Sequence, residues 1–448
     1  MKVMKFGGAA LRDGAAVAHV AAIVAATAGP RVVVVSAVAG VTDLLEDALR
    51  QIPGDAAAVG AIVAKVAAAH QAPDATLLAE LERLLYGIAY TEEVTPRLAD
   101  LLRSYGERLA VGVVAAALVA AGTPARALDA AAAGMHTLGP FGNARPDLAR
   151  QAQAIPAALG AVLAQGEVPV VTGFYGIDAD GHATLFGRGG SDYVAALVAR
   201  ALAADALELW KDVPGFLTAD PKAVPDARFV PELDYDEAAE LAFFGARLLH
   251  PRCVEPVRGA AIPIHIRSLA DPQAQGSIIR AGVPPARRSV RSAASRDGVA
   301  VLRLQGPGMA HTPGIARTVF AALEEAGVSI LNMANSQATL ALLIEAGDAA
   351  RARAALAPLV GGMVQRLDVL PDRALVCVVG RGLGETPGSA ARILQSVSDA
   401  GVNVEMISLG ASDIAIDFTV KAADRAAALR GIHHVFLEPG QPARAEAA

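Results

Sequence analysis

The chain has 448 residues, of which 54% are hydrophobic and 19% are charged, and its formal net charge is −6. That length predicts about two to four domains with substantial cores. The acidic balance excludes a typical nucleic-acid-binding protein, because phosphate contacts need clustered Lys and Arg. The longest apolar stretch, residues 109–122, is shorter than the ~18 residues that suggest a membrane span, so we expect a buried core helix there. MKVMKFGG reaches glycine before any signal-peptide core, and Cys253 and Cys377 lack metal-ligand spacing. We therefore expect a soluble, cytoplasmic protein with reduced thiols and no membrane partner.

Short apolar runs alternate with Ala-rich helical stretches over roughly the first 280 residues. Gly, Pro or polar residues bound these runs, as they bound the buried strands of parallel sheets. The expected strands are residues 2–5, 31–36, 168–173, 207–211 and 262–266. The pattern predicts an α/β domain over residues 1–280, with a mostly parallel sheet sandwiched by helices.

The stretch 275–297 differs, because it contains five arginines, the pair Pro284-Pro285 and no helical or strand period. We interpret residues 281–297 as a linker between domains.

An internal repeat follows the linker. GPGMAHTPG at residues 306–314 matches GRGLGETPG at 380–388, and AGVSI at 326–330 matches AGVNV at 400–404 with the same offset. Each copy is patterned as strand, glycine loop, helix, strand, strand, with apolar strands at 299–304 and 374–379. The loops could bind a small anion through backbone N–H groups or could only make tight turns. We expect two small domains at 298–370 and 371–438, the first completed by C-terminal residues if needed, and a disordered tail at 439–448.

Two motifs near the N-terminus suit a phosphate-containing ligand, although the chain has no P-loop motif. Lys5-Phe6-Gly7-Gly8 ends the first expected strand and combines a cation with glycines that let backbone approach an anion. Ser36 and Thr42 follow the second strand, where open α/β sheets bind ligands. The alternatives are a plain glycine turn in the first motif and simple helix capping by Ser36 or Thr42 in the second.

GRGGSDY at residues 187–193 is the most informative motif, because Arg, Ser and Asp accompany three glycines at an expected helix start. Its arginine can hold a carboxylate through two hydrogen bonds, and its aspartate can orient groups around a reacting phosphate. WKDVPG at 210–215, TADP at 218–221, and FGAR with LLHP at 244–251 follow it.

Together with YGERL at residues 105–109, these motifs resemble, in order and spacing, those of the aspartate kinases. The resemblance covers essentially the whole chain and implies an amino-acid kinase fold followed by two ACT-like βαββαβ domains. The implied activity is ATP-dependent phosphorylation of the β-carboxylate of L-aspartate to 4-phospho-L-aspartate, the entry to lysine, threonine and methionine synthesis.

The resemblance also implies site residues. Lys5 and Asp192 would be catalytic, Lys5 through the γ-phosphate. Aspartate would be bound by Ser36, Thr42, Glu107, Arg188, Gly189 and Ser191, with Arg188 on its α-carboxylate and Glu107 on its ammonium group. ATP would be bound by Lys5, Phe6, Gly7, Gly8, Lys211, Asp212, Leu217, Lys222, Arg247 and Leu248. ATP would arrive with Mg²⁺ held mainly by its phosphates, and we expect no protein-bound metal. These roles agree with the chemistry, since a carboxylate nucleophile is already ionised at pH 7 and needs positioning and charge neutralisation more than a base.

Several residues depart from the family pattern. Ala9 and Ala10 replace the usual Thr-Ser, so two hydroxyl groups near the phosphates are missing. Lys211 replaces Thr and adds a cation, while Arg247 and Leu217 replace the usual Lys and Tyr.

The ACT-like domains imply a regulatory amino acid (lysine, threonine or methionine) and a homodimer or higher oligomer formed through these domains. The expected effector residues are Met309, Thr312, Gly314, Asn335 and Ser336. Leu331 occupies a position that is Asp in some lysine-sensitive members, so lysine inhibition is left open.

Two other functions stay open from sequence. One is a kinase of the same fold acting on another small acid, such as glutamate or acetylglutamate. The other is a non-catalytic amino-acid sensor, for which Ala9 and Ala10 are the only support.

Overall fold

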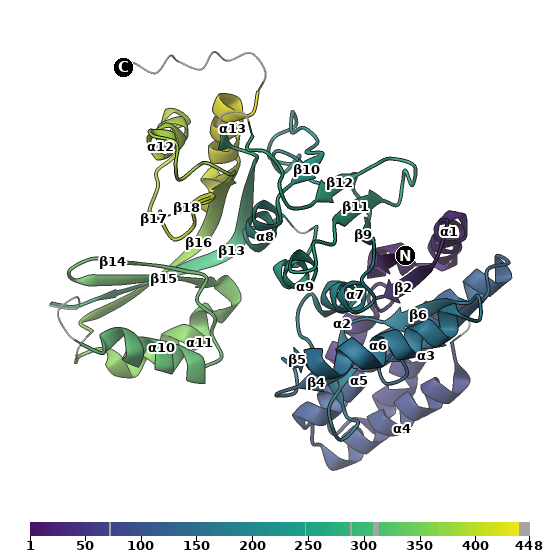
Figure 1. Cartoon of the computed structure of the whole chain (residues 1–448). Helices are drawn as coiled ribbons and strands as arrows, with labels where there is room; N and C mark the ends of the chain where they lie inside the picture. Colours follow the sequence, from purple (N-terminus) through teal and green to yellow (C-terminus); the bar gives the residue numbers. More distant parts are fainter. Residues whose placement is uncertain (71–72, 247, 287–288, 308–312, 363, 439–448) are drawn as a thin grey trace. The chain divides into compact units, whose positions relative to one another are not determined.

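The computed structural model describes residues 1–438 apart from 71–72, 247, 287–288, 308–312 and 363, and these residues form two compact units (Figure 1). The first unit contains Met1–Phe216, Pro231–Tyr235 and Arg247–Gly282. The second contains the rest of the chain, including Leu217–Val230 and Asp236–Ala246. Two segments from within the first 280 residues therefore group with the C-terminal half.

The first unit is built on an eight-stranded sheet of order β10-β12-β11-β9-β1-β2-β6-β3. Neighbouring strands are parallel except β11 and β12, which are antiparallel. The strands are β1 (Lys2–Phe6), β2 (Arg31–Val35), β3 (Ala125–Leu128), β6 (Val168–Thr172), β9 (Ala206–Lys211), β10 (Glu232–Leu233), β11 (Ile264–Ser268) and β12 (Ser277–Ile279). The predicted mostly parallel sheet is confirmed, and each of the five expected strands forms within two residues of its predicted bounds.

Helices cover both faces of this sheet. The helices are α1 (Gly14–Ala26), α2 (Val41–Gln51), α3 (Val59–Ala69), α4 (Ala75–Thr91), α5 (Pro96–Ala120), α6 (Leu148–Leu163), α7 (Gly190–Ala201) and α9 (Val254–Arg258). Met4 and Phe6 of β1 join α1, α2 and α5 in one core, while α7 packs against β1, β2 and β9. Two small hairpins complete the unit: β4 (Thr137–Leu138) with β5 (Arg145–Pro146), and β7 (Tyr175–Ile177) with β8 (Ala183–Leu185).

The apolar stretch 109–122 lies mostly in α5, as expected of a buried core helix. Thr95 caps α5 by accepting a hydrogen bond from the Leu98 N–H, and Pro96 occupies the first turn. Leu109, Val111 and Val114 of this helix are buried in the core of the first unit. Among the residues that the structure describes, no helix is both long and apolar enough to span a membrane.

The second unit contains a six-stranded antiparallel sheet of order β14-β15-β13-β16-β18-β17. Its elements are β13 (Ser292–Gln305), α10 (Ile315–Glu325), β14 (Asn332–Asn335), β15 (Thr339–Glu345), α11 (Ala349–Leu356), β16 (Arg366–Val379), α12 (Ser389–Asp399), β17 (Met406–Ser408), β18 (Ala415–Lys421) and α13 (Arg425–Phe436). Each repeat thus forms strand, helix, strand, strand, as predicted, and a second helix follows. Each copy has its own apolar core, one with α10 and α11 and the other with α12 and α13 (Figure 1). Helix α8 (Tyr235–Phe243) lies mostly within this unit.

The stretch 275–297 was wrongly expected to lack regular structure. Strand β12 forms within it, and β13 begins at Ser292. The Arg- and Ser-rich composition concealed β13, because pairing of Ser292–Arg296 with β16 stabilises the strand through tertiary contacts that periodicity does not report.

Candidate active site

Two lysines reach the same face of the central sheet. β1 and β9 are parallel neighbours, with Lys5 opposite Leu209 and Phe6 opposite Trp210. Because side chains alternate along strands, Lys5 and Lys211 project to one face while Phe6 and Trp210 project to the other. Phe6 and Trp210 stack there with ring centroids 5.8 Å apart. The strand pairing therefore brings the two cations together from positions more than 200 residues apart.

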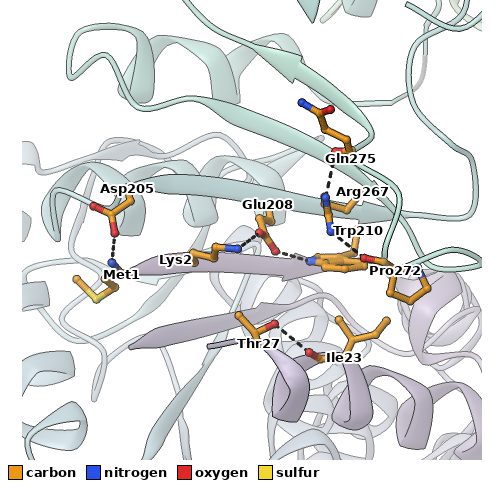
Figure 2. Close-up of polar contacts among 10 residues, drawn as sticks. All are labelled: Met1, Lys2, Ile23, Thr27, Asp205, Glu208, Trp210, Arg267, Pro272 and Gln275. Atoms are coloured by element: carbon orange, nitrogen blue, oxygen red, sulfur yellow. Dashed lines mark hydrogen bonds and ion pairs between the residues drawn. The ribbon is translucent and has the colours of Figure 1, made fainter. Parts of the chain in front are cut away.

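A buried carboxylate, Glu208, holds Lys2 and Trp210, the residue before Lys211 (Figure 2). Glu208 is only 2% exposed, and it accepts hydrogen bonds from Lys2 Nζ at 2.8 Å and Trp210 Nε1 at 3.1 Å. The Arg267 guanidinium lies 5.4 Å from the centre of the Trp210 ring. These contacts hold the Trp210 indole in place. Because Lys211 is the next residue of β9, they also restrict the position of its backbone.

The glycine loop before α7 aims Asp192 at both lysines. Gly187 and Gly189 adopt φ of 77° and 74°, a region that non-glycine residues rarely enter. Asp192 follows in the first turn of α7, with Oδ1 2.6 Å from Lys5 Nζ and Oδ2 3.5 Å from Lys211 Nζ.

The charges of this trio leave one positive charge in excess. Burial alone would raise the pKa of Asp192, but the nearby charges of Lys5 and Lys211 outweigh it and lower the pKa to about 2. Burial lowers the pKa of Lys211, and Asp192 only partly offsets this. Two cations on one carboxylate make a site suited to an anion such as a phosphoryl group.

A cavity of about 230 Å³ opens beside Asp192. Its walls come from β1, the loop after β2, the first turn of α2, α5, the loop after β6 and the start of α7. The lining residues are Lys5, Ser36, Thr42, Glu107, Phe174, Gly189, Gly190, Ser191 and Asp192. Seven of the residues that sequence analysis proposed for catalysis or aspartate binding thus converge on one small, polar space.

Glu107 is the acidic wall of this cavity. Gly106 lets α5 approach the loop after β2, since a Cβ there would lie 2.8 Å from the Ala37 side chain. Glu107 is 3% exposed, and the Ser191 hydroxyl lies 3.5 Å from Oε1. Its Oε2 has no hydrogen-bond partner among the described residues. Burial raises the pKa of Glu107 to about 8, although backbone N–H groups and the charge of Lys5 oppose the increase. A buried carboxyl group with a free oxygen suits an ammonium group.

Ser36 and Thr42 do not cap the helix that follows them. The N-cap of α2 is Gly40, with φ of 80° and no side-chain capping bond. The capping alternative is therefore wrong, and both residues lie at the cavity instead.

The remaining proposed residues of the first unit lie elsewhere or contribute only backbone. Arg188 is exposed and does not line the cavity. The Phe6 side chain is fully buried, so only its backbone could face a ligand beside Gly7 and Gly8. Asp212 is exposed at a separate cavity of about 390 Å³, and Leu248 is half-buried.

The other proposed residues belong to the second unit or are not described. Leu217 and Lys222 lie in the second unit, and Arg247 lies outside the described residues. Asn335 and Ser336 line a cavity of about 510 Å³ in the second unit, together with residues of β13, β15 and β17. Gly314 is the N-cap of α10, with φ of 86°, while Met309 and Thr312 lie outside the described residues.

Sequence reasoning missed Phe174, which lines the cavity and adopts φ of 69°. Phe174 follows β6, and ligands of open α/β sheets lie at the carboxyl ends of strands, so that rule could have identified it.

Comparison with known proteins agrees with this architecture. The amino acid kinase family matches residues 1–268, which is more than half of the chain, and two ACT domain families match residues 294–358 and 376–436. The fold and these matches show that the chain belongs to the amino acid kinase family and carries two ACT domains.

Relatives narrow the assignment. The chain is 32% identical to lysine-sensitive aspartokinase 3 of Escherichia coli over 97% of its own length and 99% of that protein. It is 34% identical to chloroplastic aspartokinase 1 of Arabidopsis thaliana over 82% of its own length, but that match spans only 65% of the relative. The structure of E. coli aspartokinase III with aspartate and ADP superposes with a TM-score of 0.84 at 30% identity, covering 98% of this chain and all of that one. Within the amino acid kinases, the chain thus belongs to the aspartokinases.

Proposed function

We propose that this chain transfers the γ-phosphoryl group of MgATP to the β-carboxylate of L-aspartate, giving 4-phospho-L-aspartate and ADP. The observation that carries the proposal is the cavity lined by Lys5, Asp192 and Glu107, in which Lys5 and Lys211 both pair with Asp192 and Glu107 Oε2 has no hydrogen-bond partner among the described residues. One side of this site suits a phosphate and the other suits an amino acid. The E. coli neighbour that holds aspartate and ADP supports the same pair of ligands.

Binding would fix the amino acid by its ammonium group. Glu107 would accept that group, since it is a buried acid of the cavity whose Oε2 has no hydrogen-bond partner within the described parts of the chain. Ser36, Thr42 and Ser191 would donate or accept hydrogen bonds around the substrate. Arg188 would clamp the α-carboxylate from the exposed side of the loop, which requires its side chain to turn toward the cavity.

Transfer then needs little acid–base chemistry. The β-carboxylate is ionised at neutral pH, so one of its oxygens can attack the γ-phosphorus while the bond to the leaving ADP oxygen breaks. Lys5 would neutralise charge on the transferring group, and Asp192 would hold Lys5 and Lys211 in place. Mg²⁺ would enter with ATP, bound mainly by phosphate oxygens. Gly7 and Gly8 would offer backbone N–H groups, and Lys211, Asp212 and Leu248 would contact the nucleotide.

The ACT domains would bind a regulatory amino acid and pair this chain with a second copy. The 510 Å³ cavity at Asn335 and Ser336 supports an effector site, and so does a neighbour, aspartokinase III of E. coli, whose structure holds lysine and aspartate. Which amino acid regulates this chain, and its cytoplasmic location, stay predictions from sequence.

An assay of acid-dependent ADP release tests the proposed activity. We expect release with L-aspartate and formation of an acyl hydroxamate when hydroxylamine traps the product. Glutamate and N-acetylglutamate should give far lower rates. Faster turnover of either acid would identify a kinase for a different substrate, and no release with any acid would favour a non-catalytic sensor.

A further inference from the structure

His250 of the LLHP motif and Arg252 after it have no part in the proposed mechanism, yet both contact the loop that carries the substrate-binding residues. His250 precedes a short 3-10 helix, Pro251–Cys253, which packs with α9 against α7. The His250 ring caps this helix, because Nδ1 accepts a hydrogen bond from the Arg252 N–H at 3.3 Å. The segment is therefore braced before it reaches the loop.

Arg252 contacts both ends of the glycine loop. Its Nη1 donates to the Phe186 carbonyl at 2.5 Å, immediately before Gly187. Its guanidinium also lies 4.8 Å from the centre of the Tyr193 ring, immediately after Asp192. The two aromatic rings meet edge to face at 5.5 Å. One cation thus ties together the two residues that flank residues 187–192.

His250 fills the middle of the same loop. A Cβ at Gly189 would lie 2.1 Å from the His250 Cγ, so the imidazole occupies the space that a side chain there would need. Burial, and then the charge of Arg252, lower the pKa of His250. A neutral ring can rest beside the cationic Arg188 and Arg252 without added repulsion.

The loop needs such support. Gly187 and Gly189 give it access to many backbone conformations, and only some of these place Arg188 and Ser191 for binding. Apparent affinity falls in proportion to the fraction of molecules whose site is competent. Asp192 itself is held separately by Lys5 and Lys211. The residues that depend most on Arg252 are therefore those proposed to bind the amino acid, Arg188 and Ser191.

We propose that Arg252, braced by His250, is a positioning residue that holds residues 187–192 in the conformation that binds the amino-acid substrate. This inference rests on the proposed function, because it assigns the loop to aspartate binding. Arg252 does not line the cavity, so it acts through the loop.

Steady-state kinetics of Arg252→Met, Arg252→Lys and Arg252→Ala test the proposal, with Arg200→Met as control. Arg200 is an exposed arginine in the last turn of α7, so its charge is matched while its loop contact is absent. We expect the aspartate KM of Arg252→Met to rise about tenfold, the value of one charge-assisted hydrogen bond, with the ATP KM within about twofold of wild type. Arg252→Lys should fall between, because lysine keeps a cation near Tyr193 but lacks the planar fork. Arg200→Met should match wild type.

Chemical rescue separates positioning from general stability. Methylguanidinium added to Arg252→Ala should lower its aspartate KM toward wild type and leave Arg200→Met unchanged. If Arg252→Ala does not fold by circular dichroism, Arg252→Lys alone carries the test. An aspartate KM within twofold of wild type in the folded variants would overturn the proposal, as would parallel changes in both KM values without rescue. Wild-type protein assayed alongside reports on the activity itself: if it releases no aspartate-dependent ADP, the proposed function fails rather than the role of Arg252.

Discussion

Aspartate binding should release a proton from Glu107. In the free protein burial raises the pKa of this carboxyl group to about 8, so the group is mostly protonated at pH 7. An ammonium group placed against Oε2 favours the carboxylate, and the proton must then leave. Lys5 and Asp192, the other charged groups at the cavity, already form an ion pair, which leaves Glu107 as the group that changes state.

The size of this release follows from the pKa. At pH 7 a group with a pKa of about 8 is about 90% protonated, so each aspartate bound should release about 0.9 proton; at pH 8.5 the figure falls to about 0.2. Isothermal titration calorimetry of aspartate into protein saturated with MgADP measures the release, from the dependence of the observed enthalpy on the ionisation enthalpy of HEPES and Tris buffers. A proton release near zero at pH 7, or one that does not change between pH 7 and pH 8.5, would refute the reasoning.

The raised pKa of Glu107 also makes the stability of the folded protein depend on pH, and the direction of that dependence follows from the pKa. Its pKa in the folded protein, about 8, lies above the usual value of 4.5, so the folded state binds the proton more tightly than the unfolded chain. Stability contributed by that proton is complete below about pH 4.5 and is lost as pH rises toward 8. Glu107→Gln keeps the shape and cannot ionise. Its thermal midpoint should therefore gain on wild type across this window while its aspartate binding is lost.

Substitutions of Lys5, Lys211 and Gly189 test the trio and the loop. Lys5→Met should lower kcat by about 10²–10³-fold while circular dichroism stays unchanged, and activity within a few-fold of wild type would remove Lys5 from catalysis. Lys211→Thr should raise the ATP KM about tenfold and leave the aspartate KM unchanged; because burial lowers the pKa of Lys211, Lys211→Arg should keep its charge, and ATP binding, to higher pH than wild type. Gly189→Ala should lose aspartate binding and about 1–3 kcal/mol or more of stability, since its φ is 74° and its Cβ would meet His250. Gly181→Ala is the matched control, because Gly181 has φ of 82° with open space around it; equal thermal shifts in the two variants would show that the His250 contact is unimportant.

The sequence predicted the fold well where burial produces a local apolar pattern and where a segment is repeated along the chain. The apolar runs gave the strands of the first sheet because buried parallel strands are apolar on both faces. The repeat predicted the element order of the second unit, because comparing its two copies shows which glycines and apolar positions recur. The start of β13 was missed because Ser292–Arg296 is stabilised by pairing with Leu375–Val379 of β16, which is distant in the sequence.

The motifs predicted which residues belong to the site, but they did not predict how those residues contact one another or how exposed they are. Lys5, Glu107 and Asp192 were named because motifs contain them. No pattern in the sequence shows that Glu107 Oε2 lacks a partner among the residues that the structure describes, or that Arg188 is exposed. Such facts depend on the packing of α5 against the loop after β2 and on the loop before α7. Arg252 could not be identified from the sequence for the same reason. Its proposed role depends on its contacts with Phe186 and Tyr193, which only the structure shows.

Lys211 shows how one residue can set the charge of the site. With threonine in its place, Lys5 and Asp192 would form a neutral pair, and the burial of Asp192 would be offset by a single cation. With lysine, the charges of both Lys5 and Lys211 lower the pKa of Asp192, and the group of three carries one positive charge in excess. Ala9 and Ala10 remove two hydroxyl donors from the same end of β1. A cation acts over a longer distance than a hydroxyl hydrogen bond and needs less exact placement. The added lysine and the missing hydroxyls are therefore consistent with one site that holds phosphate more by charge than by hydrogen bonds.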